Sequence, residues 1–264
     1  MKYAVVAVAL AVPILVAGQQ ATDGRAWVIR GGLVADGTGS ALRAADVRVV
    51  GDTITEVGTI TTRADDRVID AAGLVVAPGA IDAHNHSTDG FDADPDAVSQ
   101  VSQGLTTLLV GQDGTSPFPL SDYLAKRRSS PSAVNVAVLV GHATIRRKVM
   151  GYDFRRTATP AEMARMDALV DQEMRSGAVG LSSGLEYEVG SYASTEEVVN
   201  MARVAARHGG FYISHIRDEA DKSMDAVREA LAIGEKAKIP VQITHIKLGT
   251  VGVWHKSNDV IAMI

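Results

Sequence analysis

The sequence predicts an α/β protein whose main part is a parallel sheet, either closed as a barrel or open and doubly wound. From residue 74 onward, apolar strand-like runs alternate with helix-like stretches. The predicted strands end about every 30 residues, a spacing typical of successive βα units. Before residue 74, short strands follow one another without a helical period, which predicts a separate small β-sheet portion.

Composition and charge narrow the class of protein. With 264 residues, 46% hydrophobic and 22% charged, the chain is typical of a globular protein and can bury a large core. The net charge of −5 disfavours nucleic acid as a partner, because phosphate binding needs a basic surface. The absence of cysteine from the sequence excludes a disulfide framework, a cysteine zinc site and a cysteine nucleophile.

Residues 1–21 have the features of a signal peptide. Lys2 gives a positive start, Ala4–Ala17 is apolar apart from Pro13, and Val16-Ala17-Gly18 offers small residues for cleavage. The run is shorter than the ~20 residues of a membrane-spanning helix, which disfavours the alternative of a retained anchor. We therefore expect a secreted or periplasmic protein with no stable membrane association after cleavage.

Residues 22–73 predict the N-terminal part of a small β domain. Strand-like runs occur at Trp27–Ile29, Val47–Val50 and Thr53–Val57, separated by turns rich in Gly and Asp.

Residues 74–264 predict an incomplete set of βα units. The predicted strands are Leu74–Asp82, Leu105–Val110, Val134–Val140, Ala178–Ser182, Phe211–Ser214 and Val241–Thr244. Capping boxes at Thr159–Glu162 and Ser194–Glu197 predict two helix starts, and Gly209-Gly210 predicts the end of the second helix. An eight-stranded barrel would need two more strands, so an open six-stranded sheet is the alternative. The Gly-rich phosphate loops of nucleotide-binding folds do not follow the first strand, which disfavours that function.

Four histidines stand at the ends of predicted strands. His84 and His86 follow the first strand as His-Asn-His, and residues i and i+2 of an extended segment point the same way. His215 and His245 end the fifth and sixth strands. Each histidine alone fits a hydrogen-bonded structural role. Together they predict a site, because the carboxyl ends of parallel strands are where active sites are built.

Asp113 adds a candidate oxygen ligand after the second strand, between Gly111 and Gly114. A turn aspartate is the alternative, since Asp-Gly is favoured in turns. Four imidazoles and a carboxylate suit zinc or a similar divalent metal, as one ion or as two ions bridged by Asp113.

Three further residues are candidates for contact with substrate. Arg217 and Lys247 follow His215 and His245 by two residues. If the chain stays extended there, both cations point toward the site, where they suit a substrate carboxylate. For Arg217, an ion pair with Asp218 or Glu219 is the alternative. His142 ends the third strand and is expected to face the same side.

Several passages resemble one known family, the N-acyl-D-amino-acid deacylases (D-aminoacylases) of the amidohydrolase superfamily. The resemblance covers residues 26 to 264 in order. The passages are Val76-Ala77-Pro78-Gly79-Ala80-Ile81-Asp82-Ala83-His84-Asn85-His86, Gly141-His142-Ala143-Thr144-Ile145-Arg146, Gly180-Leu181-Ser182-Ser183-Gly184-Leu185-Glu186-Tyr187, Ser214-His215-Ile216-Arg217-Asp218-Glu219 and Gln242-Ile243-Thr244-His245-Ile246-Lys247.

The resemblance implies a metal-dependent (β/α)8 hydrolase barrel, of which about six βα units are present, with a small β-sandwich portion. It implies hydrolysis of the amide of N-acyl-D-amino acids to a carboxylate and a free D-amino acid. It also implies one or two zinc ions on a defined ligand set, with Tyr187 as a hydrogen-bond donor to substrate. The implied ligands are His84, His86, Asp113, His215 and His245.

Three departures from the family pattern qualify the resemblance. Asp113 stands where the family often has Cys, and Val189 stands where Pro is usual. The family's acid/base aspartate after the eighth strand has no counterpart, so we expect it beyond Ile264, in the missing part of a truncated sequence. Alternative functions are hydrolysis of a cyclic amide or dipeptide on the same fold, and metal binding without catalysis.

Overall fold

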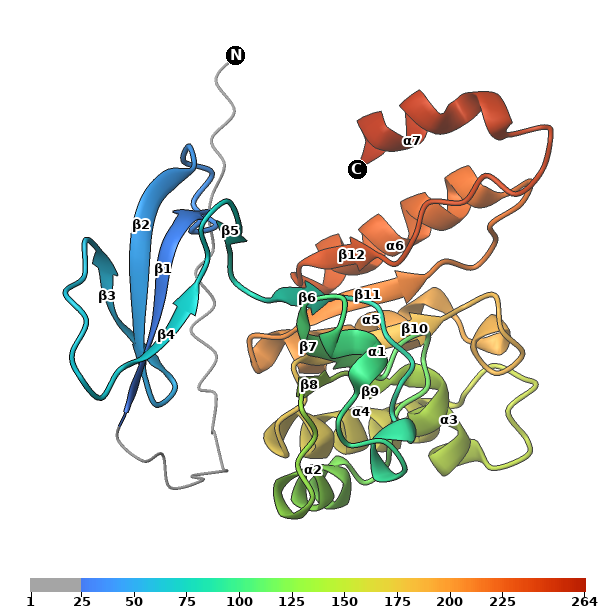
Figure 1. The fold of residues 1–264 in the computed structure, drawn as a ribbon. Coiled ribbons are helices and arrows are strands. Elements are labelled where there is room, and N and C mark those ends of the chain that lie inside the picture. The colour runs from blue at the N-terminus through green and yellow to red at the C-terminus, as the bar shows by residue number, and fades with distance from the viewer. Residues whose placement is uncertain (1–24) are drawn as a thin grey trace. The chain divides into compact units, whose positions relative to one another are not determined.

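The computed structural model describes residues 25–264 (Figure 1). The expected signal peptide, residues 1–21, lies outside the described residues. The chain divides after Pro78 into two compact units, of which the second is Gly79–Ile264. Between residues 25 and 264, the helices are all too short or too polar to cross a membrane.

The first unit is a five-stranded sheet in the order β3-β2-β1-β4, with β5 also paired to β1. Its strands are β1 (Ala26–Val34), β2 (Arg43–Val50), β3 (Thr53–Gly58), β4 (Arg67–Asp70) and β5 (Val75–Val76). β1, β2 and β3 are antiparallel, whereas β4 and β5 run parallel to β1. The three strands expected from the sequence lie within β1, β2 and β3.

The expected single strand over Leu74–Asp82 is wrong. The segment forms β5, which pairs with β1 in the first unit, and β6 (Ala80–Asp82), which opens the second. Pro78 between them has no N–H to donate to a sheet. Gly79 follows Pro78. A Cβ added to Gly79 would lie 2.1 Å from the Thr106 side chain, so only glycine fits at this position. The boundary between the units thus follows Pro78, five residues beyond the expected end of the β portion at residue 73.

The second unit holds parallel strands whose spatial order follows the chain. One sheet has the order β6-β7-β8 and the other β12-β11-β10-β9, all in parallel pairs. The strands after β6 are β7 (Leu105–Val110), β8 (Asn135–Val138), β9 (Val140–Gly141), β10 (Gly180–Gly184), β11 (Phe211–His215) and β12 (Val241–Ile243). β8 and β9 are the expected third strand, interrupted at Leu139. This succession of parallel βα units is that of a (β/α)8-type barrel, as expected.

Helices connect the strands and cover the sheets (Figure 1). They are α1 (Val98–Val101), α2 (Leu120–Ser129), α3 (His142–Met150), α4 (Pro160–Arg175), α5 (Thr195–Arg207), α6 (Ser223–Ala237) and α7 (Ser257–Met263), with short 3₁₀ turns η1 (Gly90–Asp92), η2 (Gly190–Tyr192) and η3 (Trp254–Lys256). Neighbouring helices from α3 to α6 pack against each other in chain order. Their apolar faces join the strands in one large core. The core holds the carboxyl ends of the strands in place.

The two helix starts expected from capping boxes are confirmed, with one difference. At α4 the Thr159 hydroxyl accepts from Glu162 N–H and the Glu162 carboxylate accepts from Thr159 N–H. At α5 the Ser194 hydroxyl accepts from Glu197 N–H at 3.2 Å. The Glu197 carboxylate, however, is turned into the core, where it contacts His142 and Arg146.

Candidate metal centre

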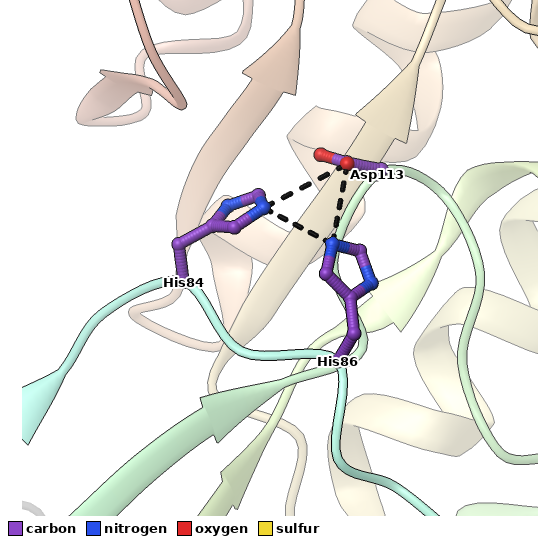
Figure 2. Close-up of side chains that lie close together, drawn as sticks. All are labelled: His84, His86 and Asp113. Carbon is purple, nitrogen blue, oxygen red and sulfur yellow. Dashed lines mark hydrogen bonds and ion pairs between the residues drawn. The ribbon is translucent and has the colours of Figure 1, made fainter.

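His84, His86 and Asp113 form a compact cluster (Figure 2). His84 Nε2 and His86 Nε2 lie 3.1 Å apart. Asp113 Oδ2 lies 3.7 Å from His84 Nε2 and 3.5 Å from His86 Nε2. The two histidines follow β6 and Asp113 follows β7, so neighbouring strand ends bring the three side chains together.

The loop after β7 is shaped to present Asp113. Asp113 has a left-handed backbone (φ 54°), as do Gly111 (φ 81°) and Gly114 (φ 82°) on either side. Gln112, the residue before Asp113 in this loop, is buried, and its side-chain Nε2 donates to Ala83 O at 3.0 Å. This hydrogen bond ties the loop of Asp113 to the chain just before His84, which holds the distance between the carboxylate and the histidine pair.

His215 and His245 complete the group of strand-end histidines. His215 ends β11, is buried, and places Nδ1 3.9 Å from Asp113 Oδ2. The ring of His245 lies 4.7 Å from the His215 ring and 6.1 Å from the His84 ring, measured between centroids. The structure therefore brings together all five residues that the sequence suggested as metal ligands.

The donor set fits a divalent metal ion such as zinc. Two ligand atoms about 2.0–2.1 Å from a tetrahedral zinc lie about 3.3 Å apart, close to the separations within the cluster. The atoms that face one another are two imidazole nitrogens and one carboxylate oxygen, the kinds of ligand atom that zinc prefers. Burial lowers the pKa of His84, and His86 and His245 add to this effect against the opposing charge of Asp113. The lowered pKa favours the neutral imidazole, the form that binds metals.

Two carboxylates that were not predicted as site residues lie beside these histidines. Glu219 Oε1 lies 2.5 Å from His245 Nδ1, and its Oε2 lies 3.6 Å from His215 Nε2. Glu186 Oε2 lies 2.9 Å from His215 Nε2. Glu219 follows His215 by four residues within one of the motifs that carry the family resemblance, and this spacing was the available signal.

Two of the candidate substrate residues lie at the cluster. The Tyr187 hydroxyl is 3.2 Å from His215 Nδ1, and the Tyr187 side chain is partly exposed. Burial raises the pKa of Tyr187, with help from the Asp113 charge, so its hydroxyl keeps its proton for donation. Lys247 Nζ donates to Glu219 Oε2 at 2.8 Å.

The other two candidates, His142 and Arg217, contact carboxylates outside the cluster. His142 is the first residue of α3, and its Nε2 lies 2.9 Å from the buried carboxylate of Glu197. Arg217 pairs with Glu229 on α6, rather than with the alternative partners Asp218 or Glu219. Both side chains therefore have carboxylate partners inside the protein. His208 caps the end of α5 and contacts Asp171 at 2.8 Å, which fits a structural role.

Comparison with known proteins agrees with this geometry. The Amidohydrolase family matches residues 67–259. D-aminoacylase from Alcaligenes xylosoxydans xylosoxydans is 37% identical over 244 residues, which are 84% of this chain and 50% of that protein. N-acyl-D-aspartate deacylase from the same organism is 37% identical over 262 residues, covering 90% and 52%. The chain thus spans about half the length of the curated relatives it matches.

A solved structure supports the same assignment. The N-acyl-D-glutamate deacylase of Bordetella bronchiseptica, complexed with zinc and a phosphonate inhibitor, superposes with a TM-score of 0.86 at 35% identity, over 90% of this chain and 54% of that one. A D-aminoacylase structure concerned with a binuclear metal centre superposes with a TM-score of 0.85 at 38% identity, over 90% and 55%. By sequence and by fold, the chain belongs to the amidohydrolase family.

Proposed function

We propose that this chain forms the metal-binding part of an amidohydrolase that cleaves N-acyl-D-amino acids to a carboxylate and a D-amino acid. The observation that carries the proposal is the meeting of His84, His86 and Asp113 with the strand-end histidines of β11 and β12. The D-amino-acid specificity is inferred from the relatives, which are a D-aminoacylase and N-acyl-D-aspartate and N-acyl-D-glutamate deacylases.

We propose zinc, as one or two ions, for the site formed by His84, His86, Asp113, His215 and His245. A zinc ion bound there would supply a hydroxide nucleophile at neutral pH and polarise the amide carbonyl. Asp113 is the carboxylate best placed between the two histidine pairs, because its Oδ2 lies within 3.9 Å of His84, His86 and His215.

Two side chains are proposed to orient the substrate. The Lys247 ammonium is half exposed, and its hydrogen bond to Glu219 is the main reason that its pKa is raised. A permanent cation beside the cluster suits the α-carboxylate of an N-acyl-amino acid. The Tyr187 hydroxyl, kept protonated, can donate to a substrate oxygen. The acid/base aspartate implied by the family resemblance is not assigned to any residue between 25 and 264.

Paired enantiomers test the proposal directly. The complete enzyme of which this chain forms part, loaded with zinc, should hydrolyse an N-acetyl-D-amino acid and leave the L enantiomer intact, and a chelator should abolish the reaction. Hydrolysis of a cyclic amide or a dipeptide in place of the N-acetyl-D-amino acid would assign the alternative substrates on the same fold. Tight zinc binding without hydrolysis of any of these compounds would assign a metal-binding role and contradict the proposal.

We also propose that the protein is exported to the periplasm or secreted, on the grounds of the apolar segment and small residues within residues 1–21. N-terminal sequencing of protein recovered from the producing cells tests this point. A mature chain that begins near residue 22 supports it, and a chain that retains Lys2 contradicts it.

A further inference from the structure

The segment 186–193 connects β10 to α5 and carries two side chains to His215. Glu186 Oε2 lies 2.9 Å from His215 Nε2, and the Tyr187 ring lies 4.4 Å from the His215 ring between centroids. The start of the segment is fixed by Leu185 N–H, which donates to His215 O at 3.0 Å. Beyond Tyr187 the segment has little regular structure, apart from the short turn η2 (Gly190–Tyr192).

Arg217 holds the far end of this segment by its backbone. Its Nη1 donates to Ser191 O and its Nη2 to Ala193 O, both at 3.1 Å. Its Nε and Nη2 also donate to the two carboxylate oxygens of Glu229, at 2.8 and 2.9 Å. The planar guanidinium is therefore shared between one carboxylate on α6 and two carbonyls of the segment, an arrangement that the single ammonium of a lysine cannot reproduce.

Arg146 holds the same segment from α3. Its Nη2 donates mainly to Phe154 O at 3.0 Å and to Arg156 O, with a longer contact of 3.4 Å to Tyr192 O, and its Nη1 is paired with Glu197. Both Arg146 and Glu197 are fully buried. Arg217 therefore binds the carbonyls of residues 191 and 193 directly, and Arg146 adds a longer contact to the carbonyl between them.

Each arginine is matched by an acid that stays ionised: Glu197 is buried and Glu229 is partly buried. Burial opposes ionisation of Glu229, but hydrogen bonds from Arg217 and Thr195 outweigh burial and hold the pKa of Glu229 below its usual range. The same balance, with His142 and Arg146 as donors, lowers the pKa of Glu197. The Nε, Nη1 and Nη2 groups of Arg217 already donate to Glu229 and to the two carbonyls of the segment. This argues against two parallel hydrogen bonds from Arg217 to a substrate carboxylate.

We propose that Arg217, assisted by Arg146, is a positioning residue: it fixes the segment 186–193 so that Tyr187 and Glu186 meet His215. Arg217 then acts on the reaction through this segment and does not bind substrate. The effect of Arg217 on catalysis rests on the proposed function, whereas its anchoring of the segment does not.

Amide hydrogen exchange tests the segment directly. Within it, Ser191 N–H donates to Tyr187 O and Ala193 N–H donates to Gly190 O. In Arg217→Lys, loss of the two carbonyl contacts should speed exchange at Ser191 and Ala193 at least about tenfold, with little change in the strands. Arg228→Lys is the control, because Arg228 is an exposed arginine of α6 that pairs locally with Asp225. Unchanged exchange at Ser191 and Ala193 in Arg217→Lys would overturn the proposal.

A second variant covers the case in which Arg217→Lys fails to fold. Glu229→Gln keeps the shape of the side chain but removes the charge that holds Arg217, so exchange at Ser191 and Ala193 should rise in this variant too. A folded Glu229→Gln protein with wild-type exchange across the segment would overturn the proposal equally.

Comparing substrates with and without an α-carboxylate distinguishes a positioning role of Arg217 from a substrate-binding role. In Arg217→Lys, kcat/KM should fall by the same factor for an N-acetyl-D-amino acid and for its uncharged α-amide, with the loss mainly in kcat. A loss confined to the carboxylate-bearing compound, expressed in KM, would make Arg217 a substrate ligand and overturn the proposal. If neither compound is hydrolysed by the wild type, the proposed function fails while the exchange result still decides the role of Arg217 in the segment.

Discussion

His84 Nε2 and His86 Nε2 face each other at 3.1 Å, on a segment of chain that has just left β6. Two nitrogens of this kind can share one proton, or both can bind one cation. The carboxylate oxygen of Asp113 lies within 3.7 Å of both nitrogens, which favours a cation between them. The pair and Asp113 come from the ends of two adjacent strands, so the fold itself sets their spacing.

The first prediction concerns the histidines at the ends of β11 and β12. His215→Ala and His245→Ala should each lower the bound zinc of the purified protein, because each removes one ligand. His208→Ala should leave the zinc content unchanged, because His208 lies at the end of α5 and loses at most ~1 kcal/mol of interaction with the helix dipole. Elemental analysis measures the three variants, and equal zinc contents in all of them would contradict the ligand assignment.

Asp113→Asn tests the carboxylate. The amide keeps the shape and suits the left-handed backbone at φ 54°, but it removes the charge that offsets two cations. A protein that binds two zinc ions should then retain one, held by the histidines. Zinc stoichiometry of the wild type and the variant, measured side by side, checks this. Equal stoichiometry and equal turnover would move any bridging role to another carboxylate beside the histidines, such as Glu186 or Glu219.

Gly111→Ala should destabilise the protein strongly. Gly111 has φ 81°, and an added Cβ would lie 2.5 Å from Leu139 O in the neighbouring strand connection. Strain and overpacking together should lower the free energy of unfolding by about 2–4 kcal/mol. Gly90→Ala is the matched control, because a Cβ added at Gly90 would meet no described atom within 4 Å, and this variant should stay within about 0.5 kcal/mol of wild type. Urea unfolding that gives equal values for both variants would refute the close approach at Gly111.

Acid should abolish the stabilising effect of Glu229. The pKa of Glu229 is lowered in the folded protein, so its ionised form stabilises the fold above the unfolded pKa of about 4.3, and this contribution is lost as the pH falls through the folded pKa. Glu229→Gln should therefore cost about 2 kcal/mol of unfolding free energy at pH 7 and progressively less below about pH 4. Denaturant unfolding across this range measures the difference. A difference that grows on acidification would contradict the sign of the shift.

The strand-end positions were predictable because they follow from local patterns. An apolar run followed by a histidine places that histidine at the carboxyl end of a buried strand, and parallel strands share this edge. This reasoning identified His84, His86, His215 and His245, and the structure brings them together. Asp113 was predictable from its place after β7, although its left-handed backbone was not.

The contacts of Arg217 and His142 could not be predicted from neighbouring residues. The expectation for Arg217 assumed that the chain stays extended after β11, whereas its partner Glu229 lies on α6 and is brought near only by the packing of that helix. His142 begins α3 directly after β9, so its ring enters the core toward Glu197. Both outcomes depend on tertiary packing that no local spacing encodes.

Zinc titration of the metal-free protein tests the central claim most directly. Calorimetry should show tight binding of at least one zinc ion by the wild type, and a loss of affinity of at least about a hundredfold in the His84→Ala/His86→Ala double variant, since each lost ligand removes a metal bond. His208→Ala should titrate like the wild type. Equal zinc affinity in the wild type and the double variant, or no binding by the wild type, would contradict a metal centre built on the His84–His86 pair.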